Sequence, residues 1–164
     1  MRRRQWMGYV RVGYAFRVNR ATYSYLILVR ADEIDELGHV NNTVYLRYAE
    51  DVARAHSDAL GLSLSVYKSL GVVPVVRRHT ITYFQSAVLG DGVRVSTQVE
   101  AFRGARAGRT TRLEREDGPL LAEVETEWVW IRVDSGRPTR VPQKVLETFG
   151  LANEAQAGAQ IKGW

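Results

Sequence analysis

The chain has 164 residues, of which 45% are hydrophobic and 25% are charged, so its length and composition predict one globular domain. It contains no cysteine, which excludes disulfides and a thiol nucleophile. The formal net charge of +5 is spread over arginines with acids between them, and no basic helix accompanies it. We therefore expect no nucleic acid partner, whereas a phosphorylated small ligand suits the charge. No apolar run is long enough to span a membrane and no signal peptide is recognised, so we expect a cytoplasmic protein without a membrane partner.

The domain is expected to occupy residues 21–150. Residues 1–20 are expected to form a poorly ordered N-terminal extension, and residues 151–164 a C-terminal tail. The first strand is predicted at Thr22–Val29, a run with the composition of a strand.

A long helix is predicted from Asn42 to Leu60. Apolar or small residues recur there at the spacing of a helix with one buried face, at Tyr45, Tyr48, Ala49, Val52, Ala53, His56, Ala59 and Leu60. The opposite face is predicted to be solvated, and it carries Arg47, Asp51, Arg54 and Asp58. Gly61 stands in the usual place of a C-terminal cap, and a shorter helix is predicted at Ser65–Leu70.

From Val72 onward the apolar pattern changes to a period of two. Residues 93–101 and 122–130 each alternate between apolar and polar side chains, and glycine-containing turns separate the segments. The pattern predicts four strands of a meander followed by a short helix at Pro142–Phe149. One long helix against a strongly curved antiparallel sheet is an α+β arrangement.

The segment between the first strand and the long helix combines several chemically useful residue types. From Asp35 to Asn42 it reads Asp-Glu-Leu-Gly-His-Val-Asn-Asn. A helix N-terminus presents unpaired backbone N–H groups and a partial positive charge. Such an end can stabilise a developing oxyanion while a nearby acid or base acts on water. The combination favours a reaction site over a simple turn.

Two segments of the chain resemble the hotdog-fold acyl-CoA thioesterases of the 4-hydroxybenzoyl-CoA thioesterase class. The first is this junction together with the helix residues that follow it, Tyr45, Tyr48, Glu50 and Arg54. The second is Ile81–Asp91, which is similar to the family's second-strand ending and turn, although the family often has proline where Ser86 stands. The resemblance runs from about residue 23 to residue 130. It implies the hotdog fold, in which a curved antiparallel sheet wraps one long central helix.

The resemblance also implies an enzyme that hydrolyses acyl-CoA to the free acid and CoA without a cofactor. The family's catalytic carboxylate stands three residues before the junction glycine, Gly38 here, and this position is occupied by Asp35. The family polarises the thioester carbonyl with a backbone N–H at the start of the central helix, near Asn42. Whether Asp35 acts as nucleophile or general base stays open. Hotdog domains pair with each active site at the dimer interface, so we expect a homodimer or a homotetramer.

The remaining site candidates have more than one interpretation. His39 is either a residue that orients the substrate by hydrogen bonding, which we favour, or a catalytic residue. Glu50 is either a salt-bridge partner of Arg54 or a reserve catalytic residue, since another branch of hotdog thioesterases uses a helix carboxylate. Further residues are expected to contact the substrate, the arginines through its phosphates: Gly38, Val40, Asn41, Tyr45, Arg77 and Arg78. Asn41 and Asn42 are also good helix-capping residues.

No metal is expected, because the three histidines lack a ligand spacing, and His56 and His79 are interpreted as structural. Two other functions stay open. The acyl group could be carried by acyl carrier protein, since a basic surface suits either carrier. The chain could also be a non-catalytic hotdog protein that binds acyl thioesters, but the intact junction favours an enzyme.

Overall fold

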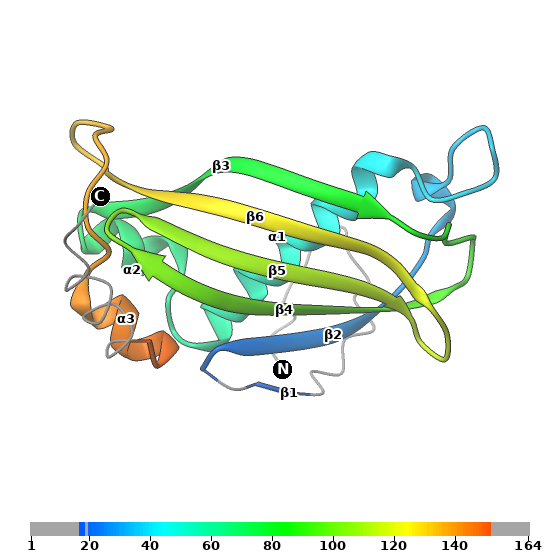
Figure 1. The fold of residues 1–164 in the computed structure, drawn as a ribbon, viewed down its shortest axis with the longest axis horizontal. Coiled ribbons are helices and arrows are strands. Elements are labelled where there is room, and N and C mark those ends of the chain that lie inside the picture. Colours follow the sequence, from blue (N-terminus) through cyan, green and yellow to red (C-terminus); the bar gives the residue numbers. More distant parts are fainter. Residues whose placement is uncertain (1–16, 19, 152–164) are drawn as a thin grey trace, which may run out of the picture.

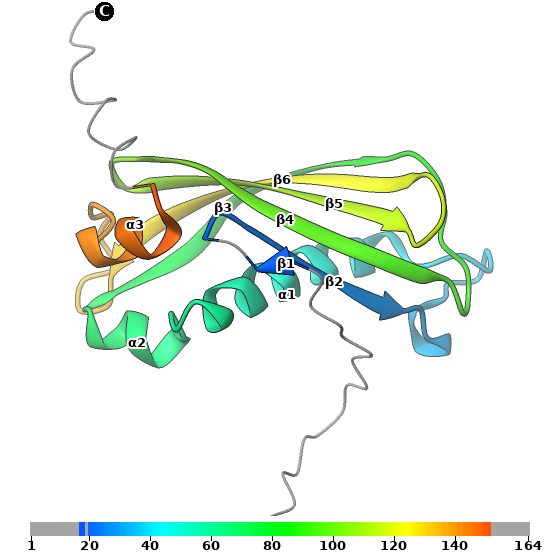
Figure 2. The ribbon, with the colours of Figure 1, turned by 90° about the horizontal axis from the view of Figure 1, so that it is seen from below.

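One long helix lies across one face of a six-stranded antiparallel sheet, and two shorter helices lie at one end of it (Figures 1 and 2). The computed structural model of the chain describes residues 17–18 and 20–151. The helices are α1 (Asn42–Ala59), α2 (Leu64–Ser69) and α3 (Gln143–Phe149). The strands are β1 (Arg17–Val18), β2 (Thr22–Leu28), β3 (Val72–Tyr83), β4 (Gly92–Arg103), β5 (Arg106–Arg115) and β6 (Leu120–Arg132). The expected α+β arrangement is confirmed, whereas the expected extension and tail lie almost entirely outside the described residues.

The strand order is β1-β2-β4-β5-β6-β3, so the predicted four-strand meander is wrong in one respect. Strands β4, β5 and β6 form consecutive hairpins, but β3 pairs with β6, as in the register of Val75 with Val129. The place beside β4 is taken by β2, through pairs such as Tyr25 with Val95. Side-chain alternation identifies a strand, but it carries no information on which strand pairs with it. Pairing with β6 alone places β3 at the edge of the described sheet.

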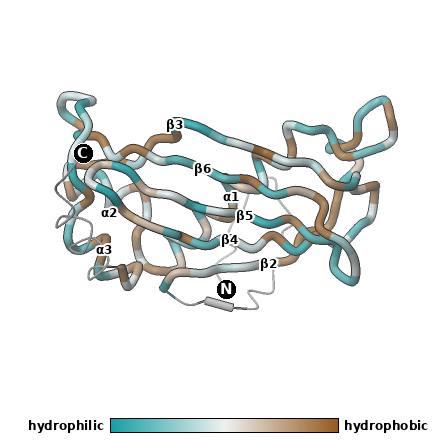
Figure 3. The backbone as a smooth tube through the Cα atoms, viewed as in Figure 1, coloured by the Kyte–Doolittle hydropathy of each residue, from teal (hydrophilic) through white to brown (hydrophobic). Residues whose placement is uncertain are grey.

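The inner face of the sheet follows the predicted alternation up to a bulge in β4. Val93, Val95 and Val99 are buried, but the register shifts between Val99 and Ala101. The extra residue turns the pleat over, so that Phe102 is buried in place of the predicted Ala101. Figure 3 shows the resulting mixture of hydrophobic and hydrophilic positions along each strand.

Helix α1 packs on this inner face through the predicted apolar side. Its buried residues are Val44, Tyr45, Tyr48, Ala49, Val52, Ala53 and His56. The helix is followed by Gly61, whose φ of 75° suits a left-handed residue that only glycine adopts cheaply. One residue of the predicted wet face differs, because the Arg47 side chain is only 39% exposed and bonds to the buried carboxylate of Glu33.

The buried residues form two apolar clusters. The first lies between the beginning of α1 and strands β2, β4, β5 and β6, and includes Tyr45, Val52 and Leu113. The second joins α2 and α3 to the other end of the sheet, and includes Tyr67 and Trp130. Within the described ranges no helix has the length and apolarity needed to cross a membrane.

Candidate active site

The strand-to-helix junction is a closed loop held by backbone hydrogen bonds. A single-turn helix, η1 (Ala31–Glu33), precedes it, and Ile34 forms an isolated β-bridge with Val40. Inside the bridge the Asp35 N–H donates to the His39 carbonyl over 2.8 Å. Gly38 makes the turn with a φ of 77°, a left-handed conformation that glycine adopts at the lowest cost. The loop therefore presents Asp35 on a defined backbone.

The Asp35 carboxylate is half-buried and oriented by its own loop. Its Oδ1 accepts hydrogen bonds from the backbone N–H groups of Leu37, at 2.9 Å, and His39, at 3.4 Å. Its Oδ2 makes no hydrogen bond with another residue of the described part. One oxygen thus fixes the side chain, and the other is available to a ligand.

The start of α1 has one amide that the fold leaves unpaired. The Asn41 side chain accepts from the Thr43 N–H, and the Asn41 carbonyl accepts from the Val44 N–H, both at 2.9 Å. The predicted capping role of Asn41 is confirmed. The N–H of Asn42 makes no hydrogen bond within the described ranges, and Asn42 is exposed. Its carbonyl accepts from the Tyr83 hydroxyl at 2.9 Å, which ties the end of β3 to the helix start.

A buried carboxylate that the sequence did not single out anchors the junction to α1. Glu33 is 4% exposed, and it bonds to the Arg47 guanidinium and the Tyr48 hydroxyl. Its backbone carbonyl accepts from the Asn41 N–H at 2.9 Å. Burial and the hydrogen bond to Glu33 raise the pKa of Tyr48, so this hydroxyl stays a donor. The sequence signal that could have pointed to Glu33 is Arg47, because this arginine stands one residue before the buried Tyr48.

Two of the six predicted contact residues are placed in the core. Val40 is 2% exposed and Tyr45 is 2% exposed, and both belong to the first apolar cluster. The Tyr45 hydroxyl accepts from the Ala87 N–H at 3.0 Å, and burial raises the pKa of Tyr45. His39 is exposed on the loop, and none of its side-chain atoms bonds to a described residue.

A cavity of about 500 Å³ lies between the three helices α1, α2 and α3 and strands β3, β4, β5 and β6. It is lined by Glu50, Tyr67, Val75, Arg109, Trp128 and Trp130, among other residues. None of the junction residues from Asp35 to Asn42 lines it. Glu50 follows Asn42 by eight residues, which is about 12 Å along the helix axis. A single chain therefore separates this apolar cavity from its junction.

Glu50 lies at this cavity and has two charged neighbours. The Arg54 guanidinium is 3.2 Å from its carboxylate, which confirms the predicted i,i+4 pair. The Nε2 of His79 on β3 lies 3.5 Å from Glu50 Oε1, and Nδ1 of the same ring is 3.0 Å from the Thr126 hydroxyl. His79 is thus a link between β3, β6 and α1. His56 is fully buried and stacks on the Tyr23 ring, so its predicted structural role is confirmed.

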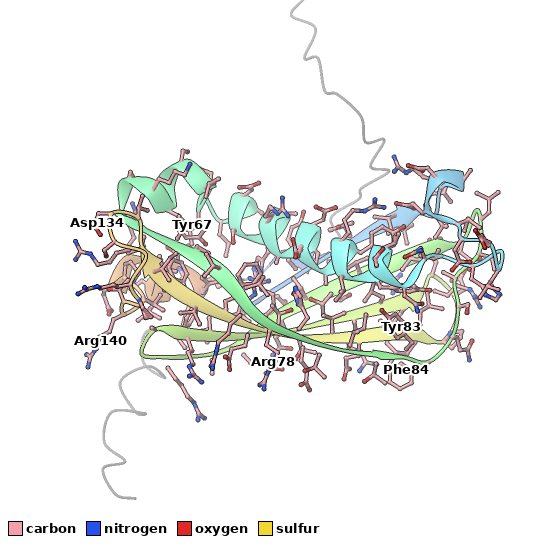
Figure 4. All side chains as sticks on the ribbon, turned by 90° about the horizontal axis from the view of Figure 1, so that it is seen from above. Tyr67, Arg78, Tyr83, Phe84, Asp134 and Arg140 are labelled. Atoms are coloured by element: carbon pink, nitrogen blue, oxygen red, sulfur yellow. The ribbon has the colours of Figure 1, made fainter. Side chains whose placement is uncertain are left out.

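The two arginines predicted to meet phosphate lie on the edge strand β3. Arg77 bonds to Glu127 at 2.8 Å, and Arg78 lies 3.9 Å from the same carboxylate. Arg78 also lines a polar hollow of about 450 Å³, together with Arg103 and Arg106. Figure 4 shows the Arg78 side chain directed away from α1. Among the residues described, no group of three or more acidic or histidine side chains is placed to hold a metal ion.

The fold and the junction agree with one protein family. Residues 29–149 match the thioesterase-like superfamily, and the chain belongs to this superfamily. The predicted class, a thioester-hydrolysing enzyme with the hotdog fold, is confirmed at the level of the family.

Individual relatives are distant but cover most of the chain. The acyl-CoA thioester hydrolase YbgC of Escherichia coli is 24% identical over 135 residues, which are 80% of this chain and 98% of YbgC. A 1,4-dihydroxy-2-naphthoyl-CoA thioesterase from Synechocystis has a TM-score of 0.72 at 22% identity, covering 78% of this chain and 95% of that one. The protein SAV2348 from Staphylococcus aureus, solved in complex with CoA, has a TM-score of 0.75 at 21% identity, covering 87% and 89%. The chain spans half the length of a Lactobacillus plantarum chain provisionally named an oleoyl thioesterase, with a TM-score of 0.75 at 23% identity.

Proposed function

We propose that the protein hydrolyses acyl-CoA thioesters, with Asp35 as the catalytic carboxylate and the Asn42 amide as the oxyanion donor. The observation that carries this proposal is the junction itself. In a member of the thioesterase-like superfamily, a loop orients one carboxylate through Oδ1 and leaves the first helical amide unpaired. The names of YbgC and of the Synechocystis enzyme, and the CoA complex of SAV2348, support CoA as the carrier of the acyl group.

The chemistry needs a donor to the carbonyl oxygen and a base or nucleophile near the carbonyl carbon. The N–H of Asn42 would donate a hydrogen bond to the carbonyl oxygen as negative charge develops on it, aided by the positive end of α1. Asp35 would either remove a proton from the attacking water or attack the carbonyl carbon itself and form a mixed anhydride. In both routes the carbon–sulfur bond breaks, CoA leaves as the thiol, and water supplies the second oxygen of the acid.

A second copy of the chain would bring the separated junction and cavity together. The cavity is lined by Pro74, Val75 and Val76 in the first half of β3, whereas Tyr83 at its other end holds the helix start. Figure 4 shows Tyr67, beside the cavity, and Tyr83 toward opposite ends of this strand. If β3 pairs antiparallel with the β3 of a second copy, the last residues of one strand lie against the first residues of the other. Each junction then faces the cavity of its partner, and the functional unit is a homodimer or a homotetramer.

The edge of the sheet has the properties such pairing requires. Strand β3 is 12 residues long and has no neighbour on its outer side within the described residues. An edge of this length with exposed apolar side chains is a template for another strand. Val75 is 38% exposed and Tyr83 is 42% exposed, followed by Phe84 at 54%.

Glu50 is the second candidate for the catalytic carboxylate. Glu50 lines the cavity and faces the imidazole of His79, whereas Asp35 does not line the cavity of its own chain. In the proposed dimer both carboxylates would lie near one substrate. We assign the chemistry to Asp35 because the Asn42 amide lies at the same junction, and we assign Glu50 to the reserve role.

The test is release of free thiol from a panel of acyl-CoAs, run beside the same acyl groups on acyl carrier protein. We expect turnover of acyl-CoAs and contact of their phosphates with exposed arginines such as Arg77 and Arg78. Turnover of the carrier-protein panel alone would replace CoA with acyl carrier protein as the carrier. Binding of acyl-CoA without thiol release would show the non-catalytic alternative and overturn the proposal.

A further inference from the structure

The cavity contains a buried cation that no carboxylate neutralises. Arg109 on β5 is 8% exposed and lines the cavity, and no acidic side chain of the described ranges lies within 4 Å of its guanidinium. Its hydrogen bonds go to neutral groups, the Nδ1 of His56 and the hydroxyl of Thr97, both at 3.2 Å and both through one nitrogen. Burial lowers the pKa of Arg109 to about 10, which still leaves it cationic at neutral pH.

Two tryptophans that line the same cavity carry indole N–H groups without an acceptor. The indole nitrogens of Trp128 and Trp130 are buried and have no hydrogen-bond partner in the described part of the chain. Trp130 is only 3% exposed. Both rings stand on β6, next to β5, and Trp128 is in register with Ala107, two residues before Arg109. A guanidinium without a counter-charge and two indole N–H groups without an acceptor thus belong to residues that line one cavity.

A buried cation and unpaired indole N–H groups are costly in this cavity, because its walls are largely apolar. Val75, Phe102 and Phe149 give the cavity apolar walls, and its carboxylates, Glu50 and Asp58, belong to α1. Glu50 is already engaged with Arg54 and His79. A buried guanidinium without a counter-charge, like a buried N–H without an acceptor, costs free energy. An anionic group on a ligand would remove both costs, since a carboxylate accepts several hydrogen bonds at once.

We propose that this cavity receives the acyl group of the substrate and that Arg109, with the indoles of Trp128 and Trp130, selects acyl groups ending in a carboxylate. The inference rests on the proposed function, since it names the acyl class that the thioesterase would take. The apolar walls would hold the methylene chain, and the far end of the chain would meet the guanidinium. The preferred substrates are therefore the CoA monothioesters of dicarboxylic acids.

The test compares adipoyl-CoA with hexanoyl-CoA, which have equally long acyl chains and differ in the terminal carboxylate. The parent should have a kcat/KM for adipoyl-CoA at least about tenfold higher, the lower end of the effect expected for a hydrogen bond to a charged group. Arg109→Met should lower the value for adipoyl-CoA by about 10- to 100-fold and leave hexanoyl-CoA within about threefold. Trp130→Phe, which keeps an aromatic ring but removes the N–H, should lower only the adipoyl-CoA value, by a few-fold.

Two outcomes would overturn the proposal. Equal losses for both substrates in Arg109→Met, together with a lower melting temperature, would show that Arg109 only supports the fold through His56 and Thr97. A parent that prefers hexanoyl-CoA would show that Arg109 does not select acyl groups ending in a carboxylate. Arg109→Lys keeps the charge without the guanidinium geometry, and under the proposal it should retain part of the preference.

A binding measurement separates this proposal from the proposed function. Trp128 and Trp130 line the cavity, so their fluorescence reports on a ligand without any turnover. Adipate should change the tryptophan emission at lower concentration than 1,6-hexanediol, which has the same chain length and no carboxylate, and Arg109→Met should remove the difference. If no acyl-CoA is hydrolysed but adipate binds in this way, the thioesterase assignment fails and the carboxylate site stands. If acyl-CoAs are hydrolysed but 1,6-hexanediol binds as well as adipate, the thioesterase assignment stands and the carboxylate site fails.

Discussion

The imidazole of His79 faces the carboxylate of Glu50, with 3.5 Å between Nε2 and Oε1. The two residues come from β3 and α1, and the contact lies at the cavity where a substrate would enter. At this distance the pair is an ionic contact when the imidazole is protonated, but the gap is too long for a good hydrogen bond. We interpret it as a link that holds the edge strand against the helix, which leaves the reaction itself to the junction.

The first prediction separates the two carboxylates. Asp35→Asn keeps the shape and the loop hydrogen bonds but removes the charge, so turnover of acyl-CoA should fall by at least ~100-fold. Glu50→Gln should stay within about tenfold of the parent, since a positioning contact contributes less than a proton transfer. Steady-state thiol release measures both variants. Asp32→Asn is the matched control, because Asp32 is exposed, pairs with Arg30 and belongs to the same segment. The opposite order of losses would move the chemistry to Glu50.

The second prediction concerns the glycine of the junction loop. Gly38→Val should strain a backbone with φ 77° by about 1–2 kcal/mol, although nothing lies within 4 Å of an added Cβ. Because the loop aims Asp35, turnover should fall more than this loss of stability explains. Gly136→Val is the control, since Gly136 has a φ of 65° and equally open surroundings. It should lower the melting temperature similarly and keep turnover near the parent value. Equal turnover in the two variants would disconnect loop geometry from catalysis.

The third prediction tests the anchor beneath the junction. Glu33→Gln removes the charge that Arg47 and Tyr48 bind, so the free energy of unfolding should drop by about 2 kcal/mol, as for lost hydrogen bonds to a charged group. The loss should stay moderate because Arg47 remains partly hydrated. Urea denaturation gives the value, with Asp32→Asn again as the surface control. A loss no larger than that of the control would mean that the buried carboxylate does not hold the junction.

The fourth prediction concerns assembly. Pairing through β3 predicts a homodimer at least, and a homotetramer is compatible with it; sedimentation at micromolar concentration measures either state. The chain has no cysteine, so a single introduced cysteine reports only its own symmetry mate. Arg77→Cys or Arg78→Cys, near the middle of β3, should form an intermolecular disulfide on mild oxidation. Val133→Cys, 51% exposed and beyond the end of β6, should not. A monomer in sedimentation would refute both the pairing and the shared site.

The elements of this fold were largely readable from local patterns in the sequence. The spacing from Tyr45 to His56 predicted α1 because a helix returns the same face every 3.6 residues, and Asn41 and Gly61 marked its ends through capping and a left-handed φ. The junction was readable for a similar reason, since Asp35, Gly38 and Asn42 are neighbours in the chain. Local geometry alone makes a carboxylate, a turn and a helix start meet.

What the sequence could not decide is contact between distant segments. Strand alternation predicted β3 but not its pairing with β6, because backbone hydrogen bonds between strands are the same for every side chain. Only the folded sheet shows Arg109 buried in one cavity with Trp128 and Trp130, with no carboxylate within 4 Å of its guanidinium. The burial of Glu33 under Arg47 and Tyr48, like the approach of His79 to Glu50, is decided by how α1 docks on the sheet. The sequence by itself determined the helix, the strands and the junction, whereas packing of remote segments determined the cavity and the charges inside it.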